Sequence, residues 1–452
     1  MPLQTKRIVI LGGGFGGMYG ALYLDRTVAR DPGVQVTLID PQNFALFTPM
    51  LHEVASGTLD PSSIVVPTRQ ALRRVEYLEA EATGIDFATR TVKIVYGVEG
   101  RTSAIPFDQL LIAAGSQTRF PPGLRRYSLG MKTIYDALIL RNWLIGMLER
   151  AEIEDDPEQR RALLTFVVAG GGFSGVETVG AINDFLHDVV PRYRRVSREP
   201  LSLALVSPGE YLLPEFDREL GRYTEARLRE AGIDVRLGTK VAGFDGRLVS
   251  LHDEKDSRSL LPVLSARTLI WTAGITPSPL IESLPFPKDR GRIVVTETMA
   301  LPGQEGVWAC GDCAAIPDET GKFYPTTAQH AIRQGTQVGR NIAAALRANA
   351  EKVRPFRYKM LGQLAAIGHR RGVASILGLR FSGFFAWFLW RGAYLIKLPT
   401  LSKKLRVALE WMLDLCFERD TVQLLTIQSV RSGRLEELLD SSIESNPQLK
   451  VG

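Results

Sequence analysis

Gly12-Gly13-Gly14-Phe15-Gly16-Gly17 and Gly170-Gly171-Gly172-Phe173-Ser174-Gly175 are two glycine fingerprints of the same form. Each follows an apolar run suited to a buried strand and precedes a helical pattern. In such a fingerprint the first glycine makes a tight turn, the second lets the backbone approach a pyrophosphate, and the third lets helix pack on strand. The helix N-terminus then offers N–H groups and a partial positive charge to the phosphates. Two copies in this setting predict two bound dinucleotides.

The composition indicates a folded protein of more than one domain. The chain has 452 residues, 45% hydrophobic and 23% charged, and this length suits about two or three domains. Its net charge of +6 is a mild excess, which does not indicate a nucleic-acid binder. Three cysteines argue against a disulfide scaffold. We expect neither a signal peptide nor a membrane-spanning helix, because a strand-like run begins at Arg7 and no apolar stretch is long enough.

The segments around each fingerprint repeat the same order. The first is expected to comprise a strand at 7–11, a helix at 17–30 and a strand at 34–39 that ends at Asp40. An acid there accepts hydrogen bonds from an adenosine ribose, although an Asp that only caps the strand is the alternative. The second has a strand at 163–169, a helix at about 175–187 and a strand at 201–206.

Apolar strands that end in glycine also recur, at 110–115 and at 269–274. A third strand-to-turn signal, Val307–Asp312, comes after the second unit is complete. We therefore predict an α/β fold of two Rossmann-like domains, with the second inserted in the first.

The chain resembles the two-dinucleotide-binding-domain flavoproteins, and within them the type II NADH:quinone oxidoreductases, or alternative NADH dehydrogenases. The resemblance covers nearly all of residues 6–425. It is carried by the two fingerprints, Ala113-Ala114-Gly115, Thr272-Ala273-Gly274, Gly311-Asp312, Ala328-Gln329-His330-Ala331, and Trp390-Arg391 through Arg419-Asp420. It implies an FAD-binding domain at 1–120 and 290–365, an NADH-binding domain at 121–289, a C-terminal amphipathic helical membrane-association region at 366–425 and a tail at 426–452.

By this resemblance FAD binds non-covalently at the first fingerprint, and NADH is the exchanging substrate at the second. Asp312 is expected near the FAD ribitol and pyrophosphate, and the loop at 47–50 beside the isoalloxazine ring. The expected cofactor-binding residues are Gly12, Gly14, Phe15, Gly17, Asp40, Thr48, Pro49, Ala114, Gly115, Gly170, Gly172, Phe173, Gly175, Glu177, Ser207, Ala273, Gly274, Gly311, Asp312, Ala328 and Gln329.

Three residues are expected to be catalytic: Glu177, Gln329 and His330. Acids are favoured in a first helical turn by the dipole alone, but the resemblance implies that Glu177 points toward nicotinamide and flavin and assists proton delivery or substrate positioning. Gln329 and His330 are placed by it on the quinone side of the flavin, where an amide can hydrogen-bond a quinone carbonyl. The family often has Ala-Gln-x-Ala-x-Gln, whereas this chain has Arg333 in the last place and Gln334 one later. The quinone pocket is therefore left open, and a plain helix-surface position for His330 and Arg333 is the alternative.

Other polar motifs have plainer interpretations. Cys310-Gly-Asp-Cys313 has dithiol spacing, but it overlaps the Gly-Asp turn, so structural cysteines are favoured. The five histidines never fall at a metal-ligand spacing, and no metal is expected. Ser207 stands where the family usually has an acid, with Glu210 nearby, and no arginine lies between Ser207 and Leu213 to hold a 2′-phosphate, which favours NADH over NADPH.

The C-terminal segment combines aromatic and basic residues. An amphipathic helix is expected at 403–418, with Leu405, Leu409 and Met412 on its apolar side. Three tryptophans and four basic residues form the mixture typical of a bilayer interface with anionic lipids; packing on the core is the alternative. They are Trp387, Trp390, Trp411, Lys397, Lys403, Lys404 and Arg406.

The resulting hypothesis is a respiratory, non-proton-pumping enzyme that passes a hydride from NADH to FAD and then two electrons to a membrane quinone, ubiquinone or menaquinone. It is expected to be a peripheral protein on the cytoplasmic face of a prokaryotic inner membrane, without nucleic-acid partners; the oligomeric state, a homodimer included, is open. One alternative is a soluble NAD(P)H-dependent flavin reductase. Another is a sulfide:quinone-type enzyme with another substrate, although Cys416 is poorly placed to bracket the flavin as such enzymes require. A third, of another class, is an NADH-sensing interaction protein like apoptosis-inducing factor.

Overall fold

The computed structural model describes residues 5–256, 260–347 and 350–424, so the predicted tail at 426–452 lies outside the described residues. The chain forms two compact units. The first comprises Met1–Leu46, Val65–Gln117 and Ile275–Met360, and the second comprises Phe47–Ile64, Thr118–Gly274 and Leu361–Gly452.

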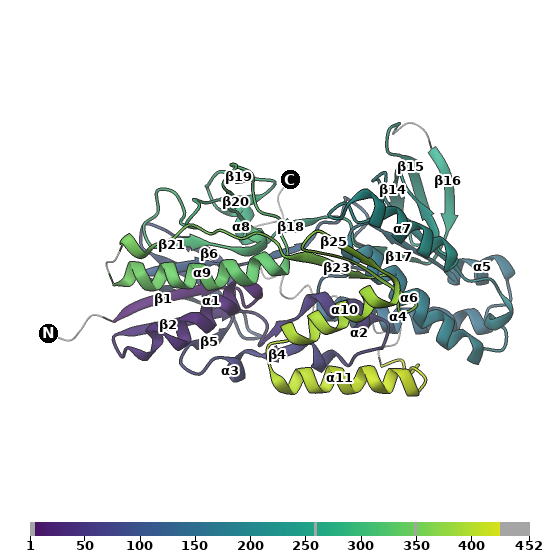
Figure 1. Ribbon diagram of the computed structural model, residues 1–452, viewed down its shortest axis with the longest axis horizontal. Coiled ribbons are helices and arrows are strands. Elements are labelled where there is room, and N and C mark those ends of the chain that lie inside the picture. The colour runs from purple at the N-terminus through teal and green to yellow at the C-terminus, as the bar shows by residue number, and fades with distance from the viewer. Residues whose placement is uncertain (1–4, 257–259, 348–349, 425–452) are drawn as a thin grey trace. The chain divides into compact units, whose positions relative to one another are not determined.

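The first unit is built on a parallel sheet of five strands in the order β21-β9-β1-β2-β5. These strands are β1 (Lys6–Leu11), β2 (Val34–Asp40), β5 (Glu76–Glu79), β9 (Gln109–Ile112) and β21 (Val307–Ala309). The apolar residues of β1 and β9 are buried, as expected of strands covered on both faces. Helices α1 (Phe15–Arg26) and α9 (Ala328–Leu346) pack closely together (Figure 1).

Smaller elements complete the first unit. Antiparallel strands β6 to β8 form a separate three-stranded sheet. The strands of this sheet are β6 (Glu81–Asp86), β7 (Thr91–Tyr96) and β8 (Arg101–Pro106). A further pair is formed by β10 (Ser116–Thr118) and β18 (Ile275–Pro277). The remaining elements are β3 (Phe44–Leu46), β4 (Val65–Pro67), α3 (Thr68–Ala71), α8 (Pro279–Ser283), β19 (Lys288–Asp289), β20 (Arg292–Val294) and β22 (Ala314–Ala315).

The second unit repeats the plan with a parallel sheet in the order β13-β12-β11-β17. Its strands are β11 (Thr165–Ala169), β12 (Ser202–Val206), β13 (Asp234–Arg236) and β17 (Thr268–Trp271). Its helices before the C-terminal region are α2 (Leu51–Ala55), α4 (Ile134–Ile153), α5 (Pro157–Leu163), α6 (Phe173–Val189) and α7 (Arg218–Glu230). A separate antiparallel sheet is formed by β14 (Thr239–Phe244), β15 (Leu248–Asp253) and β16 (Leu260–Ser265). The repeat confirms the predicted α/β class with two Rossmann-like parts.

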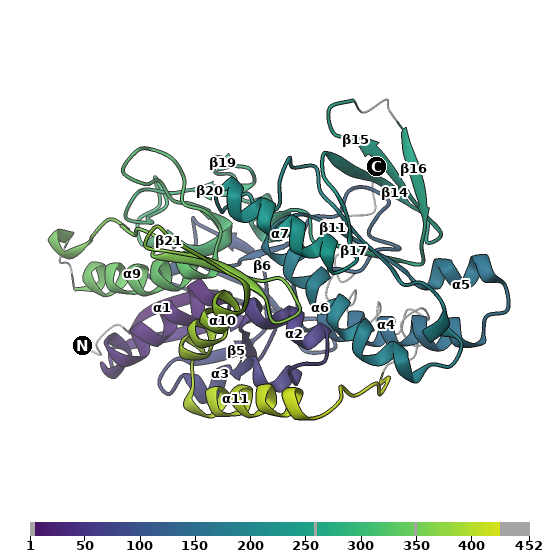
Figure 2. The same ribbon diagram turned by 45° about the vertical axis from the view of Figure 1, so that its right-hand side comes forward.

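The C-terminal region belongs to the second unit. Strands β23 (Gly362–Ala366), β24 (Gly372–Ile376) and β25 (Leu379–Ser382) lead into helices α10 (Gly383–Lys397) and α11 (Leu401–Cys416), which are neighbours (Figure 2). Gly180 of α6 lets β23 approach, because a Cβ there would lie 2.7 Å from the carbonyl carbon of Ile367. Within the described residues, no helix is long and apolar enough to cross a membrane.

The compact units do not coincide with the predicted domain bounds. Residues 275–289, expected in the NADH-binding domain, lie in the first unit, whereas Phe47–Ile64 lies in the second. The reason for the latter is that α2 packs on α4 and α6. The C-terminal region packs with the second unit from Leu361 onward instead of forming a region of its own.

Candidate functional site

The first fingerprint forms a cradle at the start of α1. A Cβ at Gly12 would overlap the carbonyl oxygen of Ala113, and a Cβ at Gly17 would overlap that of Gly12, so both positions require glycine. Gly12 also has a φ of +97°, a region that glycine adopts readily. By contrast, apart from Gly14 and its two chain neighbours, no heavy atom of the described residues lies within 4 Å of a Cβ placed on Gly14. This open space at a helix N-terminus fits a pyrophosphate.

Asp40 is fixed beside this cradle at the end of β2. Its carboxylate accepts a hydrogen bond from the N–H of Gly13 at 2.6 Å and another from the N–H of Gln42 at 2.7 Å. Burial raises the pKa of Asp40, and these two backbone bonds lower it. The Gln42 bond is a strand-end turn, and the Gly13 bond ties the same carboxylate to the fingerprint. A role of Asp40 at a ribose stays a prediction.

The Gly311–Asp312 turn lies at the end of the neighbouring strand β21. The N–H of Gly311 donates to Oε1 of Gln334 at 2.9 Å, and the hydroxyl of Ser116 donates to Asp312 at 2.7 Å. Since β1, β9 and β21 are parallel neighbours, the fingerprint, Ala114 and Gly115 after β9, and Asp312 follow carboxyl ends of one sheet. Gln334, which departs from the family pattern, therefore supports the turn.

The cysteine pair is structural in its surroundings. Cys310 and Cys313 are buried free thiols, and Cys416 is an exposed one. The Sγ of Cys310 would lie 2.9 Å from a Cβ on Gly16, and the thiol of Cys313 donates to the carbonyl of Cys310. Burial raises the pKa of Cys313 to about 12 and that of Cys310 well above its ordinary value. Such thiols are poor redox nucleophiles.

Helix α9 buries His330 in an aromatic setting. Its Nδ1 is 2.7 Å from the hydroxyl of Thr327, and its ring lies 5.5 Å from that of Tyr324 and 5.1 Å from that of Tyr358. Burial, with the charge of Arg333, lowers the pKa of His330 to about 4, so the ring is neutral. The helix-surface alternative for His330 is therefore wrong.

Gln329 and Arg333 surround the same tyrosine. The hydroxyl of Tyr358 donates to Oε1 of Gln329 at 3.1 Å, and the guanidinium of Arg333 lies 4.2 Å from the centre of its ring. The amide of Gln329 and the neutral imidazole of His330 thus meet at Tyr358, beside the charged guanidinium of Arg333.

The second fingerprint forms a matching cradle at the start of α6. A Cβ at Gly175 would overlap the carbonyl oxygen of Gly170, and the nearest described atom to a Cβ on Gly172 is Oε1 of Glu215 at 3.8 Å. Thr272, at the end of β17, donates its hydroxyl to the carbonyl of Ala169 at 2.8 Å and so ties β17 to the strand before the fingerprint. Ala273 and Gly274 follow at this edge.

Ser207 occupies in this cradle the position that Asp40 has in the first. A Cβ on Gly171 would lie 2.8 Å from its Cβ, and the side chain is buried. Glu210, three residues later, forms salt bridges with Arg218 at 3.2 Å and with Lys255 at 3.6 Å. No arginine lies between Ser207 and Leu213 in the sequence, but the fold brings two basic side chains from outside this segment to Glu210.

Glu177 lies beyond the first turn of α6, which holds no acidic residue, so the expected first-turn position is wrong; its side chain is only 8% exposed. Its Oε1 accepts hydrogen bonds from the N–H of Ala366 at 3.2 Å and the indole N–H of Trp390 at 3.1 Å. Its Oε2 is 3.7 Å from Nδ1 of His52. Burial raises the pKa of Glu177 to about 8, and the charge of Glu53 also raises it. A dipole effect alone does not explain a carboxyl group held this way.

Glu53 is a second buried carboxyl group, which sequence reasoning missed. It accepts the indole N–H of Trp411 at 3.0 Å, and burial raises its pKa to about 7. Burial lowers the pKa of the adjacent His52 to about 3, so this ring is neutral. The available signal was a pair of ionisable residues inside the apolar run Leu51–Ala55.

The tryptophans are placed differently from the prediction. Trp390 and Trp411 are buried and bonded to Glu177 and Glu53, so the expectation that they meet a bilayer is wrong. A buried indole needs an acceptor for its N–H, and these acids supply it. No group of acids, histidines and cysteines in the described residues could hold a metal ion.

Comparison with known proteins extends over almost the whole chain. Residues 6–335 match the pyridine nucleotide-disulphide oxidoreductase family, and residues 360–420 match the NDH2 C-terminal domain. The chain is 33% identical to the type II NADH:quinone oxidoreductase Ndh of Mycobacterium tuberculosis, over 98% of this chain and 96% of that protein. It is 34% identical to the demethylphylloquinone reductase NdbB of Synechocystis sp., over 91% and 97%. The structure of NDH2 from Plasmodium falciparum in complex with NADH has the same fold, with a TM-score of 0.86 at 22% identity, over 92% of this chain and 100% of that one. The chain therefore belongs to the type II NADH:quinone oxidoreductase family.

Proposed function

We propose that this protein passes a hydride from NADH to FAD and then two electrons to a membrane quinone, without pumping protons. The observation that carries the proposal is the pair of matching cradles in a chain whose relatives over nearly its whole length include an NADH:quinone oxidoreductase. A bound flavin supplies the chemistry that joins a two-electron hydride donor to a quinone.

The first cradle is assigned to FAD. Gly12, Gly14 and Gly17 shape an open space that would hold the pyrophosphate. Asp40 and Asp312, held by Gly13 and Ser116, would bind the adenosine ribose and the ribitol. The site fits FAD because the space at Gly14 is open and lies next to the carboxylate of Asp40, which the N–H of Gly13 holds. The other residues assigned to this cofactor are Phe15, Thr48, Pro49, Ala114, Gly115, Gly311, Ala328 and Gln329.

The second cradle is assigned to NADH, with Gly170, Gly172, Phe173, Gly175, Ala273 and Gly274. Ser207 takes the place of the ribose acid, and Glu210 supplies the negative charge nearby. Because Glu210 is paired with Arg218 and Lys255, their charges are not available to a 2′-phosphate, which favours NADH over NADPH.

We assign the catalytic roles with the help of the protonation states of these side chains. Glu177 has a pKa of about 8 and therefore holds a proton at neutral pH, so it can give that proton up at its Oε atoms. Gln329 and His330 are uncharged and provide hydrogen bonds to a quinone carbonyl without an ionisation step.

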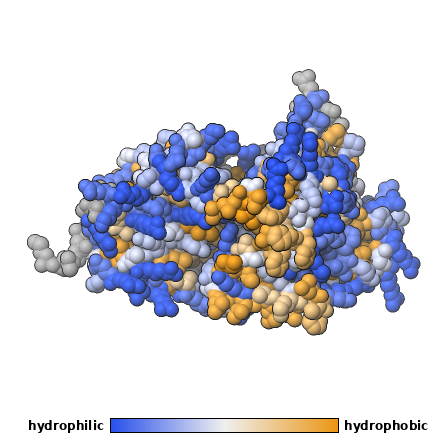
Figure 3. All heavy atoms as spheres, viewed as in Figure 1, coloured by the Kyte–Doolittle hydropathy of each residue, from blue (hydrophilic) through white to orange (hydrophobic). Residues whose placement is uncertain are grey.

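The membrane contact is assigned to α10 and α11, whose apolar residues face outward (Figure 3). The exposed apolar side chains are Phe384, Phe385, Phe388, Ile396, Leu401, Leu405, Leu409, Met412, Leu413 and Leu415. Glu410 of α11 faces the protein instead, where it accepts from the hydroxyl of Ser63 at 2.5 Å and from the N–H of Asp60 at 3.0 Å. An apolar face of this size outside the core is expected at a membrane interface.

We assign this face to anionic lipid on the cytoplasmic side of a prokaryotic inner membrane, where Lys404 and Arg406 of α11 add positive charge. A homodimer is left as a hypothesis that sedimentation in detergent would decide.

The experiment is steady-state NADH oxidation in lipid with ubiquinone and menaquinone analogues, after a visible spectrum has identified bound flavin. Rapid quinone reduction is expected. A colourless protein would contradict the proposal, turnover with soluble acceptors alone would favour a flavin reductase, and slow oxidation with a conformational change would favour an NADH sensor.

A further inference from the structure

Two buried carboxyl groups of the second unit are each held by a tryptophan from a different C-terminal helix. Trp390 of α10 donates to Glu177, and Trp411 of α11 donates to Glu53. The two indole rings lie 6.4 Å apart. The carboxyl groups are also coupled electrostatically, because the charge of Glu53 raises the pKa of Glu177. The four side chains therefore form one cluster.

The proposed reaction requires a proton from water. NADH gives two electrons and one proton as a hydride, whereas hydroquinone contains two electrons and two protons more than quinone. One proton per turnover must thus come from solution, and because Glu177 and Glu53 are both buried, at 8% and 7% exposed, this proton needs a route from the surface. This need for a proton from solution rests on the proposed function, the reduction of quinone by NADH.

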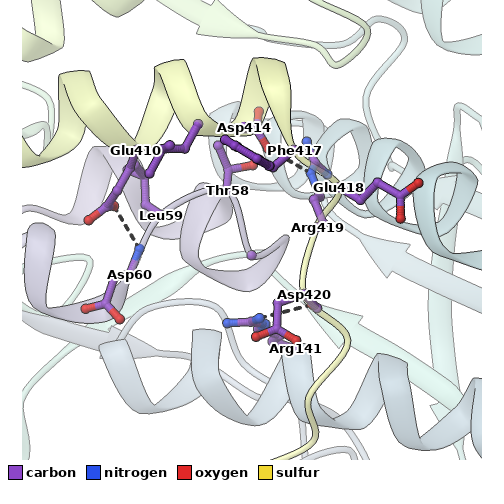
Figure 4. Close-up of a pocket in the computed structure, with 12 residues that line it drawn as sticks. Thr58, Leu59, Asp60, Arg141, Glu410, Asp414, Phe417, Glu418, Arg419 and Asp420 are labelled. Atoms are coloured by element: carbon purple, nitrogen blue, oxygen red, sulfur yellow. Dashed lines mark hydrogen bonds and ion pairs between the residues drawn. The ribbon is translucent and has the colours of Figure 1, made fainter.

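We propose that Glu53 is the carrier that takes this proton from an open cavity at the C-terminal end of α11 and passes it to Glu177. The cavity has a volume of about 270 Å³. Its wall is formed by the segment after α2, by α4 and by the end of α11 (Figure 4). The lining includes Thr58 and Leu59 from the segment after α2, and Asp414 and Arg419 from the end of α11 and just beyond it.

The cavity wall is connected to Glu53 by both backbone and charge. The carbonyl of Glu53 accepts hydrogen bonds from the N–H groups of Thr58 at 2.8 Å and Leu59 at 3.1 Å, which both line the cavity. Arg419, at the cavity, lowers the pKa of Glu53 and Asp414 raises it, although burial is the largest influence. These two residues are themselves paired at 3.1 Å. Backbone bonds and two charged side chains of the cavity wall thus connect Glu53 to the cavity.

The inner end of the route lies at α2. His52 precedes Glu53 on this helix, and its Nδ1 is 3.7 Å from Oε2 of Glu177. A neutral imidazole has one donor and one acceptor nitrogen, so it presents either role to Glu177 without becoming charged. In the transfer, the O–H bond at Glu53 breaks and one forms at Glu177.

The carboxylate left at Glu53 is stabilised by its partners until a cavity proton replaces the one given up. Trp411 bonds to it, and Arg391, whose guanidinium lies 4.6 Å from the centre of the Trp411 ring, lowers its pKa. With pKa values of about 7 and about 8, both acids gain and lose protons close to neutral pH, as a carrier must.

The test is Glu53→Gln, which keeps an oxygen acceptor for Trp411 but cannot carry a proton. Reduction of the bound flavin by NADH should keep its rate in stopped flow. Quinone reduction in liposomes should slow on the order of tenfold or more, and formic acid added as a small proton carrier should restore part of it. Glu149→Gln is the matched control, because Glu149 also accepts an aromatic donor, the hydroxyl of Tyr193 at 2.8 Å. It should behave like the unaltered protein.

An infrared titration gives a readout that needs neither cofactor nor quinone. The carbonyl band of a protonated buried carboxyl group should disappear with a midpoint near the pKa of Glu53, about 7, and this component should be absent from Glu53→Gln but present in Glu149→Gln. An unchanged pH profile of quinone reduction in Glu53→Gln, or a slow variant that formic acid does not rescue, would show that Glu53 only anchors α11. If the unaltered protein failed to reduce quinone, the proposed function would be wrong, and the infrared titration alone would decide whether Glu53 exchanges protons.

Discussion

The indole N–H of Trp390 bonds to Oε1 of Glu177 at 3.1 Å, with both side chains buried. A hydrogen bond to a carboxylate favours the charged form, so this bond lowers the pKa of Glu177 against the burial that raises it. Helix α10 therefore reaches from the apolar outer face to the acid of the second fingerprint helix.

Trp390→Phe should raise the pKa of Glu177 further, because the donor to its charged form is lost. The alkaline limb of the pH profile for quinone reduction should move to higher pH, and the free energy of unfolding should fall by about 1–3 kcal/mol. Trp143→Phe is the control: Trp143 donates to the hydroxyl of Thr268 at 2.9 Å, so stability should fall similarly with no change in the profile. Identical profiles in both variants would exclude the effect of Trp390 on Glu177.

The two buried acids should make the protein less stable as the pH rises from mildly acidic to alkaline. Glu177 and Glu53 have ordinary pKa values of 4.5, raised to about 8 and about 7 in the folded state. The folded state thus binds more protons between these values, and the stability is lost as pH rises through them. His52 acts oppositely at low pH, since its pKa falls from 6.5 to about 3. Thermal unfolding should show a higher Tm near about pH 6 than near about pH 9. The double variant Glu53→Gln, Glu177→Gln should flatten this slope, and an undiminished slope would contradict the assignment.

The three thiols should differ sharply in reactivity. Cys310 and Cys313 are buried with raised pKa values, whereas Cys416 is exposed. Because the thiolate is the reactive form, iodoacetamide should label Cys416 alone in the native protein, as peptide mass spectrometry would show. Cys416→Ser should then abolish native labelling, and rapid labelling of Cys313 would contradict a structural role for the pair.

The sequence predicted the cradles well because their requirements are local. At positions 12 and 17, every residue type with a Cβ is excluded by atoms a few residues away or next to a neighbouring strand. The position of Asp40 could be predicted because the strand β2 ends there. The pairing of Glu53 with Trp411 could not be predicted, because these residues are 358 positions apart and nothing in either segment specifies the other.

Periodicity also predicted that α11 is amphipathic but not which side meets the protein. The usual expectation places the apolar side inward, yet Glu410 is bonded to Asp60 and Ser63 while Leu405 is 63% exposed. The indoles of Trp390 and Trp411 were misassigned to the bilayer for a related reason, since a side chain with a polar edge suits either place.

Cofactor choice should depend on Glu210. This residue is paired with Arg218 and Lys255, and a guanidinium or ammonium group is what a 2′-phosphate needs. Glu210→Gln should release both cations and improve kcat/KM for NADPH by about tenfold, roughly the value of one charge-assisted bond. Glu225→Gln is the control, because Glu225 pairs with Arg229 on α7 in the same unit. Equal NADPH use by both variants would remove Glu210 from the specificity site.

Membrane binding should depend on the outward row of α11. Leu405, Leu409 and Met412 are 63%, 53% and 59% exposed, so replacing all three with serine removes apolar area without opening the core. Burial of one such side chain is worth about 1.5–3 kcal/mol, and binding to phosphatidylcholine vesicles containing phosphatidylglycerol should weaken by about tenfold or more. Ile153→Ser, at a position 76% exposed at the end of α4, should leave vesicle flotation unchanged. Point substitutions are preferable to deleting the segment, because its loss would also remove Trp390 and Trp411 from Glu177 and Glu53. Full vesicle binding by the triple variant would show that the apolar row of α11 does not hold the protein on lipid.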